Sequence, residues 1–373
     1  MSSPHPPHIA LFIPSFGDGG VGRSFVNLAN AFVERGIAVS FIVNQDDGVF
    51  FSHLDPKVER VLFRSQDDKS LTGELLHFVR EQHPRVVMTG HGRDDLVAIA
   101  VRERLRDPDV RFFLRVGTSL AHRAELRSRL PFKQWLRRWQ QQRLFARSDG
   151  IIANSQGAAT ELRKYLKTPN LPVAVLPNPT LTPELLKRAR APVEHPWLQP
   201  GELPVIMGIG RLGRAKDFPT LLRAFALVRE KRPCRLLILG KGRQLAALEQ
   251  LGRHLGIAEN VQFAGFVDNP HAHLARARLF VLSSLWEGCP NALIEALAVG
   301  TPAVATDCPS GPREILDKGR YGPLVAPGDP EAMAKVILAT LEQPLPAEIL
   351  RQAVTRYTAQ NSAQAYLEAF GLL

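Results

Sequence analysis

Two glutamates eight positions apart, Glu287 and Glu295, are the residues whose types and spacing most clearly suggest chemistry. Glu287 lies in a loop with Gly288 and Pro290, whereas Glu295 lies in a segment rich in alanine and leucine. If a helix begins near Pro290, Glu287 just precedes its N-terminus, where the first amide groups have no acceptor within the helix. Two carboxylates beside free amides can bind a ligand that has hydroxyls and phosphates, such as a nucleotide-sugar. The alternative is a pair of acids that both face water.

A glycine-rich turn with two cations is expected earlier in the same half of the chain. Gly210 and Arg211 follow the apolar run at 204–209, and Lys216 comes shortly after them. An arginine fork and a lysine point charge can neutralise a diphosphate. Each such contact at about 4 Å is worth roughly 4 kcal/mol at an effective dielectric constant of 20, before desolvation costs. Solvated surface charge is the alternative for this turn.

Three further turns contain glycines that permit close approach of a ligand to the main chain. Residues 17–22 satisfy the pattern G-x-G-x-x-G, with Gly19 and Gly20 at its centre, so nicotinamide or flavin binding is one interpretation. A loop whose amides face a donor phosphate or an acceptor is the interpretation we favour. Gly240 ends another apolar run, and Phe266 follows a third, where it offers an apolar wall to a base or ribose.

Two polar residues in the first half of the chain also follow apolar runs. His91 comes after the run at 86–89, and Arg115 lies at the end of the run at 111–116. Because the carboxyl ends of parallel strands meet at one edge of a sheet, either side chain can face a ligand there. A loop histidine with local hydrogen bonds is the alternative for His91.

Residues 122–147 combine strong positive charge with aromatic side chains. The stretch has seven arginines and one lysine against a single glutamate, and Trp135 and Trp139 are interleaved among them. This composition predicts contact with an anionic membrane surface. A solvated helix that packs its tryptophans into the protein is one alternative. Nucleic acid, with its bases stacked on the tryptophans, is another, and we disfavour it.

The bulk properties fit a protein with an anionic partner. The 373 residues suggest two domains, and the net charge of +11 with a pI near 9.9 favours phosphates, lipid headgroups or nucleic acid. Three cysteines without a C-x-x-C pair indicate buried thiols in a reducing compartment. No apolar run approaches the roughly 18 residues of a membrane span, and the first residues lack the basic segment of a signal peptide, so we expect a cytoplasmic protein. No spacing typical of a zinc cluster is present.

Short apolar runs alternate with helical patterns along the whole chain, which predicts an α/β protein with parallel sheets. The expected strands are 9–13, 38–43, 86–89, 111–116 and 150–154, and then 204–209, 235–239, 261–264, 279–283 and 303–306. The expected domains are 1–180 and 204–357, joined by a Pro-rich linker at 181–203, with helical closing residues. Two doubly wound domains would bind ligands at the carboxyl ends of their strands.

The second half of the chain resembles family 4 of the retaining glycosyltransferases, the group 1 glycosyltransferases. The resemblance is carried by the turn from Gly210 and Arg211 to Lys216, by the E-(x)7-E segment at 287–295, and by the run at 298–302. It implies the GT-B fold, which has two Rossmann-like domains facing across a deep cleft and a C-terminal helix, about 358–373, that crosses back to the first domain. It also implies that the second domain binds a nucleoside diphosphate sugar and that neither a cofactor nor a metal is needed.

The resemblance implies roles for individual residues. Arg211 and Lys216 would neutralise the leaving diphosphate, and Glu287 would contact hydroxyls of the donor sugar. The donor site would contain Gly19, Gly20, Gly210, Gly240, Phe266, Gly288, Cys289, Pro290, Asn291 and Glu295. Family members often carry a histidine in the loop that Arg115 occupies. We therefore assign His91 to the catalytic set and Arg115 to the acceptor side, with either one facing the reacting centre.

These patterns predict a metal-independent retaining glycosyltransferase. Its donor would be a nucleoside diphosphate sugar carrying a hexose or N-acetylhexosamine, and its acceptor a glycan or lipid-linked molecule in cell-surface polysaccharide or glycolipid synthesis. The protein would be cytoplasmic or peripheral on the inner face of the plasma membrane. A GT-B sugar-nucleotide epimerase, a dinucleotide-dependent oxidoreductase and a non-catalytic binding protein are the alternatives.

Overall fold

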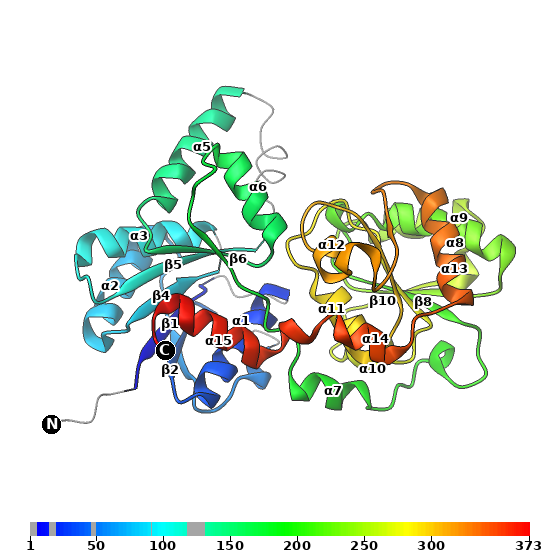
Figure 1. Ribbon diagram of the computed structural model, residues 1–373, viewed down its shortest axis with the longest axis horizontal. Helices are drawn as coiled ribbons and strands as arrows, with labels where there is room; N and C mark the ends of the chain where they lie inside the picture. The colour runs from blue at the N-terminus through cyan, green and yellow to red at the C-terminus, as the bar shows by residue number, and fades with distance from the viewer. Residues whose placement is uncertain (1–5, 15–19, 46–49, 91, 118–130) are drawn as a thin grey trace. The chain divides into compact units, whose positions relative to one another are not determined.

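The computed structural model describes residues 6–14, 20–45, 50–90, 92–117 and 131–373 (Figure 1). The chain forms two compact units. The first comprises Met1–Pro179 together with Thr358–Leu373, and the second comprises Thr180–Tyr357. Each unit is built on one parallel sheet with helices between its strands.

The sheet of the first unit has the strand order β3-β2-β1-β4-β5-β6-β7. Its strands are β1 (His8–Phe12), β2 (Ala38–Val43), β3 (Glu59–Leu62), β4 (Val86–Thr89), β5 (Arg111–Val116), β6 (Gly150–Ala153) and β7 (Val173–Val175). The helices of this unit include α1 (Gly20–Glu34), α2 (Asp68–Gln82), α3 (Gly92–Leu105), α5 (Pro131–Phe145), α6 (Gln156–Leu166) and α15 (Ala359–Phe370). The central strands are buried and almost wholly apolar, as parallel strands covered on both faces require.

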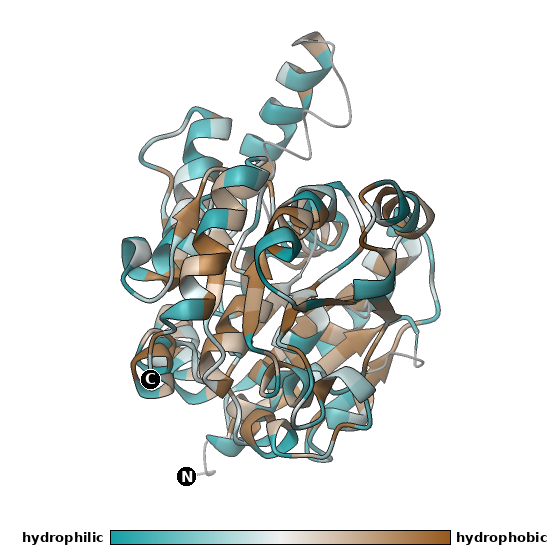
Figure 2. Ribbon diagram, turned by 90° about the vertical axis from the view of Figure 1, so that its right-hand side faces the viewer, coloured by the Kyte–Doolittle hydropathy of each residue, from teal (hydrophilic) through white to brown (hydrophobic). Residues whose placement is uncertain are grey.

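The sheet of the second unit has the strand order β10-β9-β8-β11-β12-β13. Its strands are β8 (Val205–Ile209), β9 (Arg235–Leu239), β10 (Val261–Gly265), β11 (Leu279–Leu282), β12 (Ala303–Thr306) and β13 (Leu324–Val325). Its helices include α7 (Pro183–Ala189), α8 (Phe218–Lys231), α9 (Leu245–His254), α10 (Pro270–Leu274), α11 (Asn291–Val299), α12 (Pro312–Ile315), α13 (Pro330–Glu342) and α14 (Ala347–Gln352). In Figure 2 the strands are mostly hydrophobic (brown), and the outer turns of the helices are mostly hydrophilic (teal). The sheet therefore forms the inner layer, and the helices form the outer ones.

Both sheets are doubly wound, and in each the direction of winding reverses once. The reversal lies between β1 and β4 in the first sheet and between β8 and β11 in the second. The loops that leave neighbouring strands at such a point diverge to opposite faces of the sheet. The crevice they leave at the carboxyl ends is where open α/β sheets bind ligands.

All ten strands expected from the sequence are present, each within one residue of its expected ends, and the structure adds β3, β7 and β13. These three strands are short. In β3 the sequence begins Glu59-Arg60, and the outward residues of this edge strand are solvated. An edge strand therefore lacks the apolar run by which the other strands were recognised.

The Pro-rich stretch at 181–203, expected to be a linker, is part of the second unit. It contains α7, which has Thr182 as its N-cap and a proline in its first turn. Leu185 and Leu198 are buried in the apolar core of the second unit. The prolines set the turns of this segment, but its buried leucines hold it against the second sheet.

The closing helix α15 belongs to the first unit and packs beside α1 (Figure 1). Tyr366 and Phe370 are fully buried, and both rings contact Phe32 of α1. Arg35 donates hydrogen bonds to Gln360 and Gln364 along the rim of the same contact. The last helix of the chain therefore completes the core of the unit that contains the first strand.

Candidate active site

An ion pair lies at the point where the winding of the second sheet reverses. Lys216 follows β8 in a short 3-10 turn, and Glu287 lies in the loop after β11. The Lys216 Nζ and Glu287 Oε1 atoms are 2.6 Å apart, and both side chains are largely shielded from water. Two residues distant in sequence, predicted separately to bind a diphosphate and a sugar, are thus in direct contact.

Two serines at the end of β11 fix both partners of this pair. The Ser284 hydroxyl donates to Glu287 Oε1 at 2.6 Å, and the Ser283 hydroxyl donates to the Lys216 carbonyl at 2.7 Å. Both serines are buried, and Thr306 of β12 donates to the Ser284 carbonyl. Buried hydroxyls with good partners hold a charged group in one position. Our sequence interpretation missed these serines, although two adjacent polar residues that end a buried strand were a usable signal.

The oxygens of Glu287 are not equally engaged. Oε1 accepts from both Lys216 and Ser284, whereas no hydrogen bond to Oε2 occurs among the residues that the structure describes. Lys216 has three donor hydrogens, of which the ion pair uses one. The pair therefore retains both an acceptor and donors for a ligand.

The glycines around this pair are required by close backbone packing. Gly210 has φ +155, and a Cβ there would lie 2.7 Å from Lys216 Cε. Gly240 has φ +139, and its Cβ would lie 2.0 Å from the Gly210 carbonyl oxygen. The turns after β8 and β9 therefore lie directly against each other at Gly240, and a side chain at Gly210 would displace the Lys216 stem.

The predicted cation Arg211 and the apolar wall Phe266 lie at the same edge of the second sheet and are exposed. Arg211 precedes the turn that ends in Lys216, Arg214 lies in that turn, and neither has an ion pair within the described part of the chain. Lys241, after β9, lies 6.0 Å from the ring centroid of Phe266, after β10. This edge of the second unit therefore presents positive charge from consecutive strand ends, with one aromatic ring beside it.

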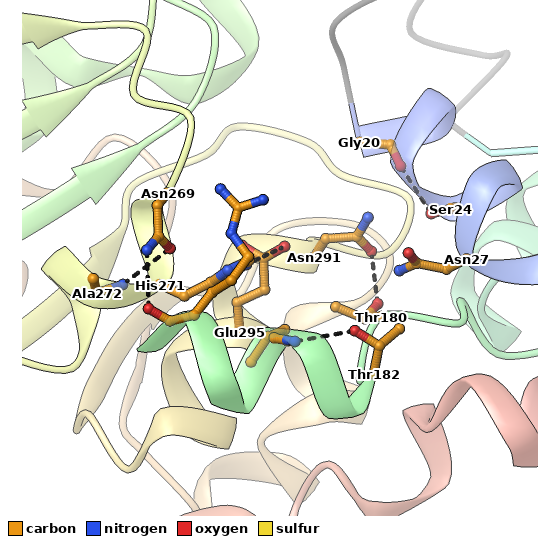
Figure 3. A network of polar contacts seen from close by, with 12 residues as sticks. Gly20, Ser24, Asn27, Thr180, Thr182, Asn269, His271, Ala272, Asn291 and Glu295 are labelled. Atoms are coloured by element: carbon orange, nitrogen blue, oxygen red, sulfur yellow. Dashed lines mark hydrogen bonds and ion pairs between the residues drawn. The ribbon is translucent and has the colours of Figure 1, made fainter. Parts of the chain in front are cut away.

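Glu295 lies deeper in the second unit than Glu287 does. Its side chain is on α11, is 3% exposed, and has its Oε1 atom 3.7 Å from Nε2 of His271 on α10, as Figure 3 shows. At this separation the buried carboxylate and the imidazole are electrostatic neighbours. The structure thus separates the two glutamates of the E-(x)7-E segment into a partly exposed loop acid and a buried helix acid.

The loop between these glutamates is tightly packed. Gly288, Cys289 and Pro290 are buried, and a Cβ on Gly311 would lie 2.5 Å from Pro290 Cδ. Asn291 begins α11, and its Oδ1 accepts from the Thr180 hydroxyl at 3.1 Å (Figure 3). The first amide groups of α11 therefore follow Glu287 by only a few residues in the chain.

The cysteine near the ion pair is not a nucleophile. Burial raises the pKa of Cys308 to about 12, and the negative charge of Glu287 adds to this shift. Burial likewise raises the pKa of Cys234 to about 11. Both thiols are therefore protonated at neutral pH, which excludes them as thiolate nucleophiles.

In the first unit, the buried side chain of Arg115 joins neighbouring segments of the chain through hydrogen bonds. It lies at the end of β5, is 4% exposed, and stacks over the Phe25 ring at 5.3 Å. Its Nε donates to the Tyr366 hydroxyl at 3.1 Å, and its Nη2 donates to Asn178 Oδ1 at 2.7 Å. These bonds join the strand to α15 and to the segment that leaves the first unit. The atom Nη1 has no partner within the described residues.

Two other predictions for the first unit fall wholly or partly outside the described residues. His91 and Gly19 lie outside them, whereas Gly20 is the first residue of α1 and accepts from the Ser24 hydroxyl at 2.8 Å. Three and four positions after residue 91, Asp94 and Asp95 in the first turn of α3 are both buried. The Thr89 hydroxyl, at the end of β4, donates to Asp95.

We predict that Asp95→Asn stabilises the protein at alkaline pH. Burial raises the pKa of Asp95 from 3.8 to about 8, and Asp94 adds to the shift. The folded state therefore binds this proton more tightly than the unfolded state, and the stability it confers is lost as pH rises from about 4 through about 8. Asparagine keeps the acceptor for Thr89 without the charge. Urea denaturation at about pH 5 and about pH 9 should show the variant gaining relative to wild type at the higher pH; equal differences at both would contradict this assignment.

The structure holds no assembled metal site among the residues it describes. No three side chains of histidine, cysteine, aspartate or glutamate lie close enough together there to bind a metal ion. Within those same residues, every helix is too short or too polar to cross a membrane.

Two family models match this chain in succession. Residues 18–180 match the family described as Glycosyltransferase Family 4, and residues 203–343 match the family described as Glycosyl transferases group 1. The chain belongs to the group 1 glycosyltransferases. The matched segments correspond to the two units, so both halves of this glycosyltransferase carry the family's pattern.

Curated relatives of this group 1 glycosyltransferase cover different shares of it. LpsE, a lipopolysaccharide core biosynthesis glycosyltransferase of Rhizobium meliloti (strain 1021), is 29% identical over 324 residues, which make up 86% of this chain and 85% of LpsE. An uncharacterized glycosyltransferase of Methanocaldococcus jannaschii is 35% identical over 195 residues, so the match spans about half of each chain, 48% in both.

Solved structures share its fold over almost the whole length. HepE of Anabaena, in complex with UDP and glucose, aligns with a TM-score of 0.80 at 20% identity over 98% of this chain and all of HepE. WaaG, a glycosyltransferase involved in lipopolysaccharide biosynthesis, aligns with a TM-score of 0.70 at 15% identity over 98% of both chains. This likeness confirms the predicted GT-B fold.

Proposed function

We propose that this chain is a retaining glycosyltransferase that moves a sugar from a nucleoside diphosphate donor to a glycan or lipid-linked acceptor. The observation that carries the proposal is the ion pair of Lys216 and Glu287 at the winding reversal of the second sheet. One partner is a cation suited to a diphosphate, and the other is an acceptor suited to sugar hydroxyls. A nucleotide-sugar presents both groups within a few bonds of each other.

The chemistry begins with the bond from the anomeric carbon to the phosphate oxygen. As this bond breaks, positive charge develops on the sugar and negative charge on the diphosphate. Lys216 and Arg211 stabilise the diphosphate, and Lys216, which Glu287 already holds in place, favours this charge separation without reorganisation. The acceptor oxygen then bonds to the anomeric carbon on the same face, and its proton passes to the departing phosphate oxygen, so the anomeric configuration is retained.

Glu287 orients the sugar in this proposal. Its Oε2 atom accepts from a sugar hydroxyl, while Oε1 remains bound to Lys216 and Ser284. Correct placement of reacting atoms can contribute several kcal/mol to a barrier. We assign to Glu295 a supporting role, reaching the ribose from α11, and to the amides of 288–291 contacts with phosphate or sugar. We further propose that the fixed cations act without a metal ion or other cofactor.

Related proteins support the donor and acceptor classes. HepE has been solved in complexes with UDP and glucose and with UDP-glucose. LpsE is named for lipopolysaccharide core biosynthesis, and a relative in Campylobacter jejuni, 34% identical over 44% of this chain, is named for transfer of N-acetylgalactosamine to a diphospho-undecaprenol glycan. We therefore propose a hexose or N-acetylhexosamine as the transferred sugar and cell-surface glycan synthesis as the setting.

The test is a donor screen followed by a transfer assay. Uridine, guanosine and adenosine diphosphate sugars are added singly, and a specific donor raises the melting temperature by mass action. The stabilising donor is then incubated in EDTA with candidate acceptors, and the product is examined by NMR for its anomeric configuration. Transfer with retention in EDTA is the expected result. Inversion, a need for added metal, or donor consumed without a glycosylated product would each contradict the corresponding part of the proposal.

Ser284→Ala should lower kcat/KM about tenfold or more, because hydrogen bonds to charged groups contribute about 1.5–3 kcal/mol. The loss arises because Glu287 is no longer held by the hydroxyl that accompanies Lys216. Ser310→Ala is the matched control, since it removes a buried hydroxyl that has no partner among the described residues. Steady-state kinetics and melting curves are measured for both variants. Equal values of kcat/KM for Ser284→Ala and Ser310→Ala would exclude an orienting role for Ser284.

A further inference from the structure

Helix α5 carries an exposed aromatic row on one side. Phe132, Trp135 and Trp139 are 69%, 55% and 41% exposed, and their spacing of three and four places them along one face of the helix. The rings of Phe132 and Trp135 stack with centroids 6.2 Å apart. Large aromatic side chains grouped at the surface mark interaction sites, because exposure of so much apolar area is unfavourable in water.

Other side chains of α5 anchor the helix to the first unit. Gln142 donates to the carbonyl of Leu166 at the end of α6, and the Arg138 guanidinium lies 5.6 Å from the Tyr165 ring centroid. Phe145 is buried in a cluster with Leu162. Figure 1 shows α5 beside α6 at the margin of this unit. The aromatic row is therefore displayed by a helix that is itself packed against α6.

Positive charge surrounds the row. Helix α5 contains four cations, Lys133, Arg137, Arg138 and Arg143, and no acid. The Arg143 guanidinium lies 4.6 Å from the Trp139 ring centroid, so cation and aromatic ring form one surface. The aromatic row and these cations together are called the α5 face below.

We propose that the α5 face docks this chain onto an anionic lipid bilayer. A helix with aromatic side chains on one side and arginines and lysines around them lies in the membrane interface, its rings among the headgroups and its cations on lipid phosphates. A second copy of this chain would bring the same positive charge to the contact and would be repelled. Among the anions that could pair with these cations, lipid best fits a row led by Phe132, because this fully apolar and exposed ring is stabilised by burial at the boundary of headgroups and acyl chains.

The primary test is sedimentation with vesicles, which requires neither donor nor acceptor and so is independent of the proposed transferase activity. The protein should bind vesicles of equal parts phosphatidylglycerol and phosphatidylcholine and should not bind vesicles of phosphatidylcholine alone. Binding should weaken as salt shortens the screening length from about 10 Å at 0.1 M to about 3 Å at 1 M. Equal binding to both vesicles would overturn the proposal.

Two variants separate charge from apolar insertion. Lys133→Glu combined with Arg143→Glu should weaken binding roughly 25-fold or more, since each cation near an anionic surface contributes about fivefold. Trp135→Ser combined with Trp139→Ser should weaken it about tenfold or more, through lost apolar contact. Unchanged binding in either variant would refute the α5 face as the docking site.

A charge-matched control and a contact probe complete the design. Arg223→Glu with Lys231→Glu on α8 makes the same change in net charge at exposed positions of the second unit, and binding should fall no more than a few-fold. Trp135→Phe with Trp139→Phe should keep binding but lose most quenching of tryptophan fluorescence by brominated lipid. Undiminished quenching, or tighter binding to a single-stranded oligonucleotide than to the anionic vesicles, would overturn the assignment to lipid.

Discussion

Glu287→Ala is expected to lower turnover at least about 100-fold while leaving the second unit folded, and Lys216→Ala is expected to do the same. Each substitution removes a group proposed to contact the donor and also leaves its partner, 2.6 Å away in the native pair, without its counter-charge. Because the two groups act together, the double variant should lose far less than the product of the single losses. Transfer kinetics with the identified donor measure all three.

Controls for these variants come from helix α13. Lys335→Ala and Glu342→Ala remove one cation and one acid at exposed positions of the same unit, and turnover should remain within about twofold of wild type. Melting temperatures show whether a loss of turnover reflects unfolding. Near-normal turnover in both Glu287→Ala and Lys216→Ala would remove the ion pair from the mechanism, whereas strictly multiplicative losses would show that the two residues act separately.

Tyr366→Ala is expected to destabilise the first unit by about 3–5 kcal/mol, as large aromatic-to-alanine changes in cores do. The Tyr366 side chain is fully buried, contacts Phe32 and Phe370, and accepts a hydrogen bond from Arg115. Its removal leaves a cavity and takes the Tyr366 hydroxyl from the Arg115 guanidinium as a hydrogen-bond partner. Chemical denaturation measures the loss of stability, and limited proteolysis should show earlier cleavage near α15.

Tyr366→Phe separates the two contributions. It keeps the ring and removes only the hydroxyl, so the loss should be about 1–3 kcal/mol, the cost of leaving a buried donor unsatisfied. If both variants destabilise equally, the hydrogen bond to Arg115 and not the ring packing holds the helix. If neither does, α15 contributes little to the first unit.

The architecture was largely predictable because strands buried on both faces are near-continuous apolar runs. The runs at 86–89 and 235–239 are examples, and both are strands with those bounds. The edge strands were not predictable, since residues such as Glu59 and Arg60 in β3 face solvent and give no apolar signal. The stretch at 181–203 misled for a different reason. Its prolines are typical of a linker, and only packing shows that Leu185 and Leu198 are buried.

The candidate site was predictable in its residue types and not in its contacts. Glycines, cations and acids at strand ends indicated a phosphate and sugar ligand, and several of them meet at the edge of the second sheet. Spacing along the chain could not show that Lys216 pairs with Glu287, because that contact depends on β8 and β11 being neighbours. Nor could it show that Glu295 is buried beside His271, since the helix face that turns inward is set by tertiary packing.

The position of α15 has a consequence for biosynthesis on the ribosome. Ala363, Tyr366, Leu367 and Phe370 belong to the same buried cluster as Ile9 and Leu11 of the first strand. Domains usually fold in the order in which they are translated. Here the first unit is completed only after Ala359–Phe370 has been made, whereas the second unit, residues 180–357, is contiguous and can fold before that. The core of the first unit around Tyr366 is thus left open while residues 180–357 are made.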